Sequence, residues 1–418
     1  MVALVTHSKL KITIIGLHYA PEPSGNAPYT TSLAEGLSQR GHDVTVVTGY
    51  PHYPEWSVHS GYRGWSLKQS LNGVGVKRLR HFVPRHPSTL GRLHMEFSFG
   101  VRVLATNWHK PDVVVLVSPA LFSSGIALLR ARLLGRQKGT MIWVQDIYSR
   151  GIVETGGKPG LVSRGMALVE RRVLGSVDAV VAIHDRFARY ISEGLHVQPD
   201  SVHVVRNWTH LPPSKPVDRE AVRRKLGWNA TDIVALHSGN IGKKQGLSNV
   251  VEAARLAEST GSRVKFVLMG DGNQRTTLET SAKGLKQIEF VDALPQSDFQ
   301  AALEAADVLL VNELPGVRDM SVPSKLTSYF TSGRPVLAAT DEGSVTAEEI
   351  SNSGAGIRVD AGDPAALVSA VESLGENADL ASSLGKQGRI FREKTLSETF
   401  ALGRYDDLIT SLALSRGR

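Results

Sequence analysis

Two segments, one in each half of the chain, repeat the same order of apolar strand, glycine-containing loop and helical stretch. They are Lys11 to Gly16, Pro21 to Tyr29 and Thr30 to Arg40 in the first half, and Ile233 to Leu236, the loop up to Gly246 and Leu247 to Ala257 in the second. Glycines allow a tight turn, and backbone N–H groups at the start of a helix attract anions. Each loop alone is a weak signal, but the repeat indicates two Rossmann-like domains.

Short hydrophobic runs that alternate with helical stretches continue both halves, which is the pattern of parallel sheets. These predicted strands are Asp43 to Thr48, Pro111 to Val117, Met141 to Asp146, Ala179 to His184, Val202 to Asn207, Val264 to Met269, Ile288 to Val291, Val308 to Val311, Pro335 to Ala339 and Gly356 to Val359. The fold class is therefore α/β, with one Rossmann-like domain over residues 1–210 and another over residues 211–395. His210 to Asp218 is the predicted linker, and residues 396–418 are predicted to form a helix that packs back on the first domain.

Composition limits the classes of protein that fit. The chain has 418 residues, of which 41% are hydrophobic and 21% charged, and this balance is typical of a globular protein with two or three domains. It contains no cysteine, which excludes disulfides, thiolate zinc sites and thiol catalysis. It shows neither an apolar run long enough to span a membrane nor the apolar core of a signal peptide, so we expect a cytoplasmic protein.

Positive charge is concentrated in the N-terminal half. Residues 1–210 hold 24 Lys and Arg against 13 Asp and Glu, a net charge of +11. The whole chain has a net charge of +8, so the remainder of the chain is slightly acidic. Basic amphipathic stretches at Leu90 to Trp108 and Leu121 to Lys138 suit an anionic membrane surface, with Arg130 and Arg132 as predicted lipid contacts. The alternative is that both stretches are crossover helices whose arginines are simply solvated.

The order of several motifs resembles glycosyltransferase family 4, whose GT-B fold places two Rossmann-like domains with parallel sheets across a cleft. The motifs are Pro-Glu-Pro-Ser-Gly at 21–25, Arg-Gly-His-Asp-Val at 40–44, Gly-Asn-Ile-Gly-Lys-Lys-Gln-Gly at 239–246, Gly-Asp-Gly at 270–272, Pro-Ser-Lys-Leu at 323–326 and Gly-Arg-Pro-Val at 333–336. Lys-Gln-Gly and Pro-Ser-Lys resemble the branch that builds colanic acid, O-antigen and capsule, which includes transferases of aminodeoxy sugars.

The resemblance implies that a nucleotide-sugar, here a UDP-sugar, is bound mainly by the second domain. Lys244 and Lys325 would then neutralise the leaving diphosphate, and Asp146, at a predicted strand end, would point into the ligand crevice as the third catalytic residue. Asp146 has an alternative role as a helix cap, and His184 at another strand end is more often structural. The remaining candidates for nucleotide-sugar binding are Gly25, Asn26, Gly239, Asn240, Lys243, Gln245, Gly270, Gly272, Ser324 and Ser328.

The chain departs from the family pattern at several of these positions. Asn240 and Gln245 stand roughly where many members have Arg and Lys. Met320 and Ser328 stand where many have two glutamates, one of which grips the ribose. Among neighbouring residues, Glu313 or Arg318 would have to compensate, together with Lys325.

The resemblance also implies retaining chemistry, in which the leaving phosphate helps to deprotonate the acceptor hydroxyl, with no metal and no cofactor. We therefore expect a cytoplasmic transferase, peripheral on the inner face of the membrane. It would move a sugar, such as an N-acetylated aminodeoxy sugar, to a polyprenyl-diphosphate-linked saccharide. The alternatives are a soluble small-molecule acceptor, a GT-B UDP-sugar epimerase and, least favoured, a basic nucleic-acid-binding protein, because nucleic-acid binding leaves both glycine loops unexplained.

Overall fold

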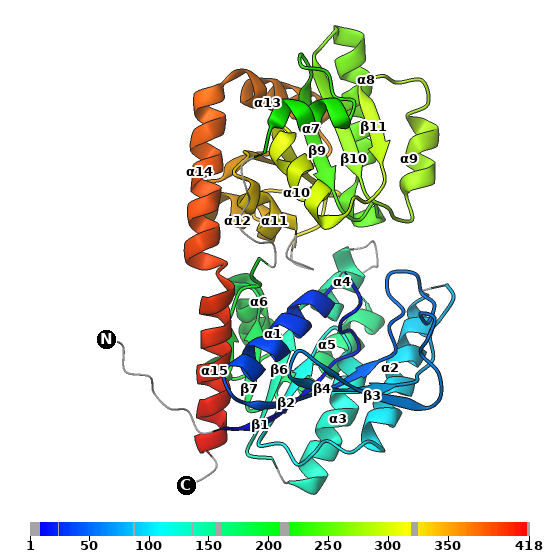
Figure 1. Cartoon of the computed structure of the whole chain (residues 1–418), viewed down its shortest axis with the longest axis vertical. Coiled ribbons are helices and arrows are strands. Elements are labelled where there is room, and N and C mark those ends of the chain that lie inside the picture. The colour runs from blue at the N-terminus through cyan, green and yellow to red at the C-terminus, as the bar shows by residue number, and fades with distance from the viewer. Residues whose placement is uncertain are drawn as a thin grey trace. The chain divides into compact units, whose positions relative to one another are not determined.

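The computed structural model describes residues 9–415, apart from positions 24, 87, 136, 155–159, 210–216 and 319–324. The described chain forms two compact units. The first is built from the chain up to residue 210 together with the C-terminal helix α15 (Glu398–Ser415), and the second from residues 211–397. Each unit contains one sheet (Figure 1).

The first sheet has eight strands in the spatial order β3-β4-β2-β1-β5-β6-β7-β8. They are β1 (Lys11–Ile15), β2 (Asp43–Gly49), β3 (Ser66–Leu71), β4 (Val74–Leu79), β5 (Val113–Val117), β6 (Gly139–Val144), β7 (Ala179–Ala182) and β8 (Val202–Val204). All neighbours are parallel except the hairpin β3–β4, which the sequence analysis missed. Its signal was Asn72-Gly73, both of which adopt the positive φ of a tight hairpin turn.

Seven α-helices among the described residues complete the first unit: α1 (Ala27–Gln39), α2 (Thr89–Leu104), α3 (Leu121–Leu134), α4 (Tyr148–Glu154), α5 (Leu161–Leu174), α6 (Asp185–Arg189) and α15. Helix α15, red in Figure 1, contacts α1 and β6 although it comes last in the sequence. Its Tyr405 ring packs 5.2 Å from Trp143, and its Asp406 lies 2.7 Å from His42. Burial of this aromatic contact ties the end of the chain to the first unit.

The second sheet has six strands, all parallel, in the order β11-β10-β9-β12-β13-β14. They are β9 (Ile233–Ser238), β10 (Val264–Met269), β11 (Ile288–Val291), β12 (Val308–Asn312), β13 (Val336–Ala339) and β14 (Gly356–Val359). Successive residues of β9 belong to two hydrophobic clusters, Ile233 and Ala235 to one and Val234 and Leu236 to the other. Because side chains alternate along a strand, the two clusters are the cores on opposite faces of the sheet.

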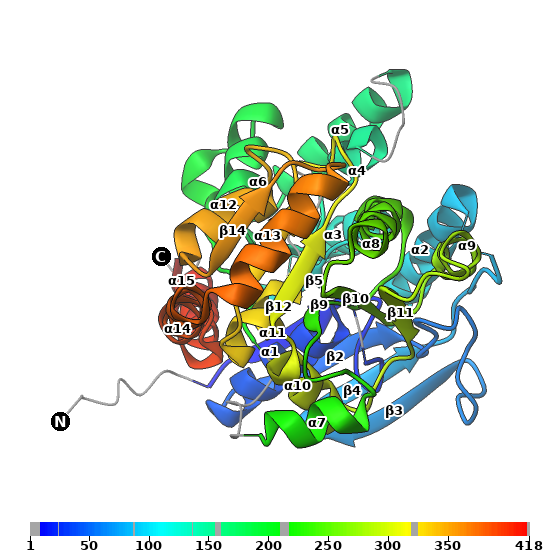
Figure 2. The ribbon, with the colours of Figure 1, turned by 90° about the horizontal axis from the view of Figure 1, so that it is seen from above.

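Helices cover both faces of this second sheet. They are α7 (Arg219–Lys225), α8 (Ser248–Thr260), α9 (Arg275–Ser281), α10 (Gln296–Ala305), α11 (Lys325–Ser332), α12 (Val345–Ser353), α13 (Pro364–Glu376) and α14 (Ala378–Thr395). Figure 2 shows α8 and α13 on one side of the strands and α7 and α10 on the other. The predicted α/β class with two Rossmann-like sheets is confirmed.

Both sheets reverse their strand order at an equivalent point. In the second unit the reversal lies between β9 and β12, and in the first between β1 and β5. In open parallel sheets, ligands bind beyond the carboxyl ends of the strands at such a reversal. The two loops singled out by the sequence follow β1 and β9, so each begins at the reversal of its own sheet.

Candidate active site

The loop after β9 is held by close contact between backbones. Gly239 has φ +109° and Gly270, after β10, has φ +133°, values that only glycine adopts without strain. A Cβ atom added to Gly270 would lie 2.0 Å from the Gly239 carbonyl oxygen, and one added to Gly272 would lie 2.4 Å from that of Ile241. Gly270 and Gly272 are therefore required because the two loops touch there without room for a side chain, and Gly239 is required by its positive φ.

Polar side chains lock the rest of this loop. The side-chain carbonyl of Gln245 accepts the N–H of Gly242 at 3.1 Å, and the Asn240 amide lies 3.5 Å from the same oxygen. Asn312, the last residue of β12, donates to the carbonyls of Gln245 at 2.8 Å and Gly246 at 3.1 Å. Gln245 thus shapes the loop, and Asn312 fixes the loop to the sheet, which the sequence analysis did not predict.

The predicted lysines lie on and beside this loop. Lys243 is exposed and Lys244 half-buried in the turn before α8. Lys325 begins α11, and its Nζ lies 3.1 Å from Nε2 and 3.3 Å from Nδ1 of His237, near the end of β9. A Cβ atom on Gly239 would be 4.0 Å from Cε of Lys325. The structure therefore brings Lys325 under the glycine loop, across 86 positions of sequence.

Burial sets the charge of this group. Loss of water around Lys325 lowers its pKa to about 7, the attraction of Glu313 opposes this shift, and the repulsion of Lys244 adds to it. Burial likewise raises the pKa of Glu313, whose Oε1 accepts from Thr346 at 2.7 Å and whose Oε2 accepts from Thr340. Burial also lowers the pKa of His237, which is therefore neutral. A lysine whose pKa lies near 7 is partly neutral by itself. An anion bound beside it raises that pKa, so the lysine becomes fully charged in the complex.

The remaining candidates of the second unit are less informative. Ser324 and Met320 lie outside the described residues. Ser328 is buried on α11. Arg318 is exposed, and its Nε lies 3.3 Å from Asp341. Of the two residues proposed to compensate for the missing glutamates, Glu313 therefore has the closer electrostatic link to both lysines.

In the first unit, Gly25 and Asn26 lead into α1. Gly25 has φ +68°, and an added Cβ atom would meet only the Tyr53 ring, at 3.7 Å. The Asn26 amide lies 3.5 Å from the carbonyl of Ser118, directly after β5. This contact joins the loop after β1 to the strand across the reversal of the sheet.

Asp146 follows β6 at the same edge of the first sheet and is exposed. Its charge acts on Tyr53 and Tyr148, so its carboxylate lies near both phenols. The Glu170 carboxylate accepts the first two backbone N–H groups of α4, that of Tyr148 at 2.6 Å and that of Ser149 at 3.1 Å. Glu170 therefore caps the helix that follows Asp146. His184 is structural: its Nδ1 accepts the N–H of Arg186 at 3.1 Å and caps α6.

A histidine–glutamate cluster at this edge was missed. His18, just after β1, lies with its Nδ1 2.7 Å from Oε2 of Glu22, and the other carboxylate oxygen accepts the N–H groups of His52 at 2.8 Å and Tyr53 at 3.0 Å. The signal was present as a histidine four residues before a glutamate in the first loop. The partners His52 and Tyr53, which follow β2, could be found only through the pairing of β1 with β2.

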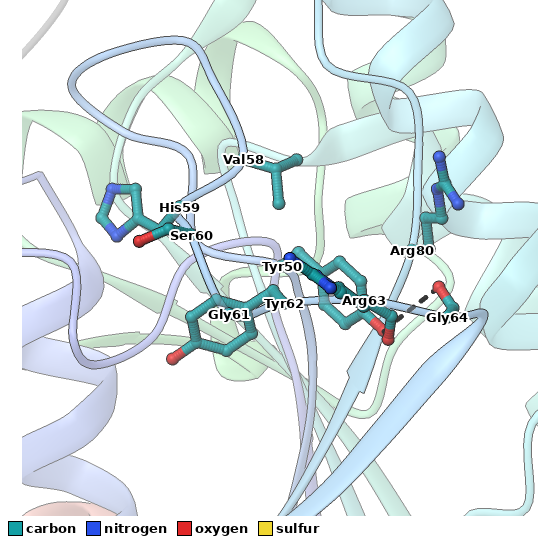
Figure 3. Close-up of a pocket in the computed structure, with 9 residues that line it drawn as sticks. All are labelled: Tyr50, Val58, His59, Ser60, Gly61, Tyr62, Arg63, Gly64 and Arg80. Atoms are coloured by element: carbon teal, nitrogen blue, oxygen red, sulfur yellow. Dashed lines mark hydrogen bonds between the residues drawn. The ribbon is translucent and has the colours of Figure 1, made fainter.

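A cavity of about 340 Å³ opens beyond β2 and β4 (Figure 3). Arg63 and Arg80 are among its lining residues. The Tyr50 hydroxyl donates to the carbonyl of Arg63 at 2.7 Å, which closes the loop around the cavity. Two arginines among the lining residues bring positive charge to the cavity, which suits an anionic group.

Known proteins match the chain over most of its length. A glycosyl transferase 4-like domain matches residues 24–208, and a glycosyl transferases group 1 domain matches residues 218–391. The putative colanic acid biosynthesis glycosyl transferase WcaI of Escherichia coli is 34% identical, over 78% of this chain and 82% of that protein. The probable glycosyltransferase WbjE of Pseudomonas aeruginosa is 26% identical, over 76% and 78%.

Solved structures with the GT-B fold also superpose on the chain. Sucrose-phosphate synthase from Thermosynechococcus elongatus gives a TM-score of 0.76 at 16% identity, covering 97% of this chain and 99% of that one. Anabaena HepE in complex with UDP gives 0.71 at 14% identity, covering 96% and 100%. At sequence identities this low, the similarity shows only that the chains share a fold.

Proposed function

Because the chain belongs to glycosyltransferase family 4, we propose that it moves a sugar, such as an N-acetylated aminodeoxy sugar, from a UDP-sugar to a polyprenyl-diphosphate-linked saccharide. The product would enter a surface polysaccharide. The observation that carries the proposal is Lys325 beneath the Gly239 loop, with Lys244 beside it.

These groups match the charge that develops during transfer. As the bond from the anomeric carbon to the phosphate oxygen breaks, its electron pair stays on the diphosphate. Lys325 and Lys244 would attract that charge, and N–H groups of the glycine loop would donate to it. In the reaction that we propose, the anomeric carbon retains its configuration. The leaving phosphate receives the proton of the acceptor hydroxyl, and the lysines take the place of a metal ion. Asp146 would act on the acceptor side, and Gly25 would leave the backbone of its own loop open to a ligand.

The comparisons support the choice of donor and pathway. HepE was crystallised with UDP and with UDP-glucose, and WcaI is named for colanic acid biosynthesis. Extending a uridine nucleotide and a polysaccharide pathway to this chain is our proposal.

Exposed apolar side chains on α2, α3 and α5 favour a membrane-bound acceptor. Helix α3 contacts both other helices. The exposed residues are Leu90, Phe97, Val101 and Leu104 on α2, Leu129, Leu133 and Leu134 on α3, and Leu161, Val162 and Leu168 on α5; we call them the apolar patch. Exposed Arg132, Arg164, Arg171 and Arg172 lie on the same helices. Apolar side chains with nearby cations suit peripheral binding to an anionic, cytoplasmic leaflet.

Arg130, predicted from the sequence as a lipid contact, also has a structural role. Its guanidinium donates to the carbonyls of Val103 at 2.9 Å and Leu104 at 2.7 Å, and it lies 4.4 Å from the Trp108 ring centre. Arg130 therefore closes the C-terminus of α2, because the last carbonyls of a helix need donors. Among the described residues, no helix is both long and apolar enough to cross a membrane.

Two measurements test this function. A thermal-shift screen of nucleotides and nucleotide sugars identifies the donor, since a ligand of the folded state raises apparent stability. Incubation of that donor with a polyprenyl-diphosphate-linked saccharide should then add the mass of one sugar to the lipid. An altered sugar without transfer would identify an epimerase, and transfer only to soluble saccharides would overturn the lipid acceptor. Salt-sensitive binding to RNA or DNA, with no thermal shift from any nucleotide or nucleotide sugar, would overturn both the transferase function and the lipid acceptor.

A further inference from the structure

The cluster of His18, Glu22 and His52 has no part in the function proposed so far. Glu22 is the anchor: its side chain is 1% exposed, and both carboxylate oxygens are occupied by the donors described above. His18 is the outward member, with its side chain 17% exposed. Its ring packs 5.1 Å from that of His52 and 5.7 Å from that of Tyr53, so its orientation is fixed on several sides.

The hydrogen bonds decide which nitrogen of His18 carries the proton. Burial alone would raise the pKa of Glu22, but the hydrogen bond from His18 and the backbone N–H of His52 bring it below its usual value. Glu22 is therefore an ionised carboxylate that can only accept. In the neutral form of the His18 ring the proton therefore lies on Nδ1, which can donate to the carboxylate, and Nε2 keeps a lone pair.

Nε2 of His18 is free to meet a ligand. No hydrogen bond to it is found from any residue that the structure describes. His18 follows the central strand β1 at the reversal of the first sheet, where ligands of open α/β sheets bind. Asp146 is close by, because its charge acts on Tyr53, whose ring contacts His18.

We propose that His18 binds the saccharide acceptor, with Nε2 accepting a hydrogen bond from an acceptor hydroxyl and Glu22 serving as the positioning residue that fixes the tautomer. This rests on the proposed transferase function. The hydroxyl held by His18 is a neighbour of the reacting one, so a fixed imidazole acceptor positions the saccharide while the proton of the reacting hydroxyl passes to the leaving phosphate. The oxygen of that reacting hydroxyl forms the bond to the anomeric carbon, and the diphosphate keeps the electrons of the bond that breaks.

The substitution Glu22→Gln tests the tautomer directly. The carbonyl of the new amide can still accept the N–H groups of His52 and Tyr53, but its NH₂ group must donate to Nδ1 of His18. The proton of His18 then moves to Nε2, which becomes a donor. We expect two-bond ¹⁵N–¹H NMR spectra to show Nδ1–H His18 in the wild type and Nε2–H His18 in the variant.

The kinetic test uses the donor found by the screen and a synthetic polyprenyl-diphosphate-linked saccharide. We expect His18→Ala and Glu22→Gln each to raise KM for the saccharide about tenfold, the effect of losing one hydrogen bond in a desolvated site, while UDP affinity is unchanged. The matched control is Glu55→Gln, because Glu55 forms the same i,i+4 pair with His59, at 3.0 Å, but is exposed. It should leave KM unchanged.

Several outcomes would overturn the inference. If the wild type transfers sugar and both variants keep its KM, His18 does not bind the acceptor. If Glu22→Gln raises KM without changing the tautomer, or lowers UDP affinity in parallel, Glu22 is merely structural. The three side chains also offer ligand atoms within 4.8 Å of one another. Stoichiometric Zn²⁺ binding that requires His18 and Glu22, with transfer lost in EDTA, would make this a metal site instead. If the wild type transfers no sugar, the proposed function fails and this inference falls with it.

Discussion

The loops after β1 and β9 begin at equivalent reversals of two sheets, yet they are built differently. The loop after β9 is a backbone structure, in which Gly239 and Gly270 touch and Lys325 lies beneath. The loop after β1 is a side-chain structure, in which Glu22 gathers one imidazole and two backbone N–H groups. Cβ atoms added to Gly270 and Gly272, in the loop after β10, would collide with the backbone of the loop after β9, whereas one added to Gly25 would meet only the Tyr53 ring.

The difference suits the two recognition tasks of the function that we propose. A diphosphate is the same in every nucleotide-sugar, and N–H groups with a lysine bind it whatever the sugar. A saccharide acceptor differs from one polysaccharide to the next, and fixed side chains with defined donors and acceptors distinguish hydroxyl patterns. The comparison therefore predicts that substitutions in the two loops separate donor binding from acceptor use.

Removal of the Lys325 ammonium should have the largest effect. Lys325→Ala should lower kcat/KM by more than a hundredfold, about 3 kcal/mol, because it removes a preorganised charge from the leaving group. The free energy of unfolding should hardly change, since a buried lysine of lowered pKa stabilises the fold little. Lys283→Ala, at an exposed lysine of the same unit, is the control for steady-state kinetics. Unchanged turnover would remove Lys325 from the site.

The loops after β9 and β1 should also respond differently when a methyl group is placed against them. Gly270→Ala, in the neighbouring loop after β10, forces a Cβ atom against the backbone of Gly239 and should lower the free energy of unfolding by about 3 kcal/mol, with loss of UDP binding. Gly25→Ala has room and should lose only about 1 kcal/mol, from its positive φ, with UDP affinity intact. Urea unfolding and UDP calorimetry check both. Equal losses would abolish the distinction between the loops.

Donor binding should depend on pH through Lys325. Its pKa of about 7 leaves it increasingly neutral above pH 7, whereas a bound diphosphate favours the charged form. The complex therefore holds more protons than the free protein, and UDP affinity should fall as pH rises above 7, by up to about tenfold per unit.

Calorimetry in two buffers of different ionisation enthalpy measures this proton uptake. Lys325→Arg is the control, because an arginine stays charged and should flatten the profile above pH 7. Equal binding heats in both buffers for the wild type would contradict a neutral Lys325. His18 variants in the other loop should leave the wild-type pH profile of UDP binding in place.

The smallest effect is expected at the apolar patch. Leu133→Ser should weaken binding to anionic vesicles by about 1 kcal/mol, because one partly inserted side chain is lost. Ile390→Ser on α14, at an exposed apolar residue of the other unit, is the control in co-sedimentation at low and high salt. UDP affinity should be unchanged in both. Vesicle binding that is equal in both variants would exclude the patch as the membrane contact.

Most strands followed from the sequence, because buried parallel strands are continuous apolar runs bounded by turns. The runs at β10, β11 and β14 were predicted with the observed bounds. The hairpin β3–β4 was missed, since its alternating, half-exposed residues resemble a loop unless Asn72-Gly73 is taken as a turn signal. The helix end that Arg130 caps was also missed, because a sequence shows a charge but not the carbonyls that it meets.

The sequence by itself determined the two sheets, the glycine loops and the family, since these depend on local patterns and on the order of motifs. Only the tertiary structure decided what surrounds the candidate side chains. Lys325 meets His237, and Glu22 meets His52, because strand order brings distant segments to one edge. Protonation follows from that placement, because burial and neighbouring charges fix a pKa, and neither can be computed from position along the chain.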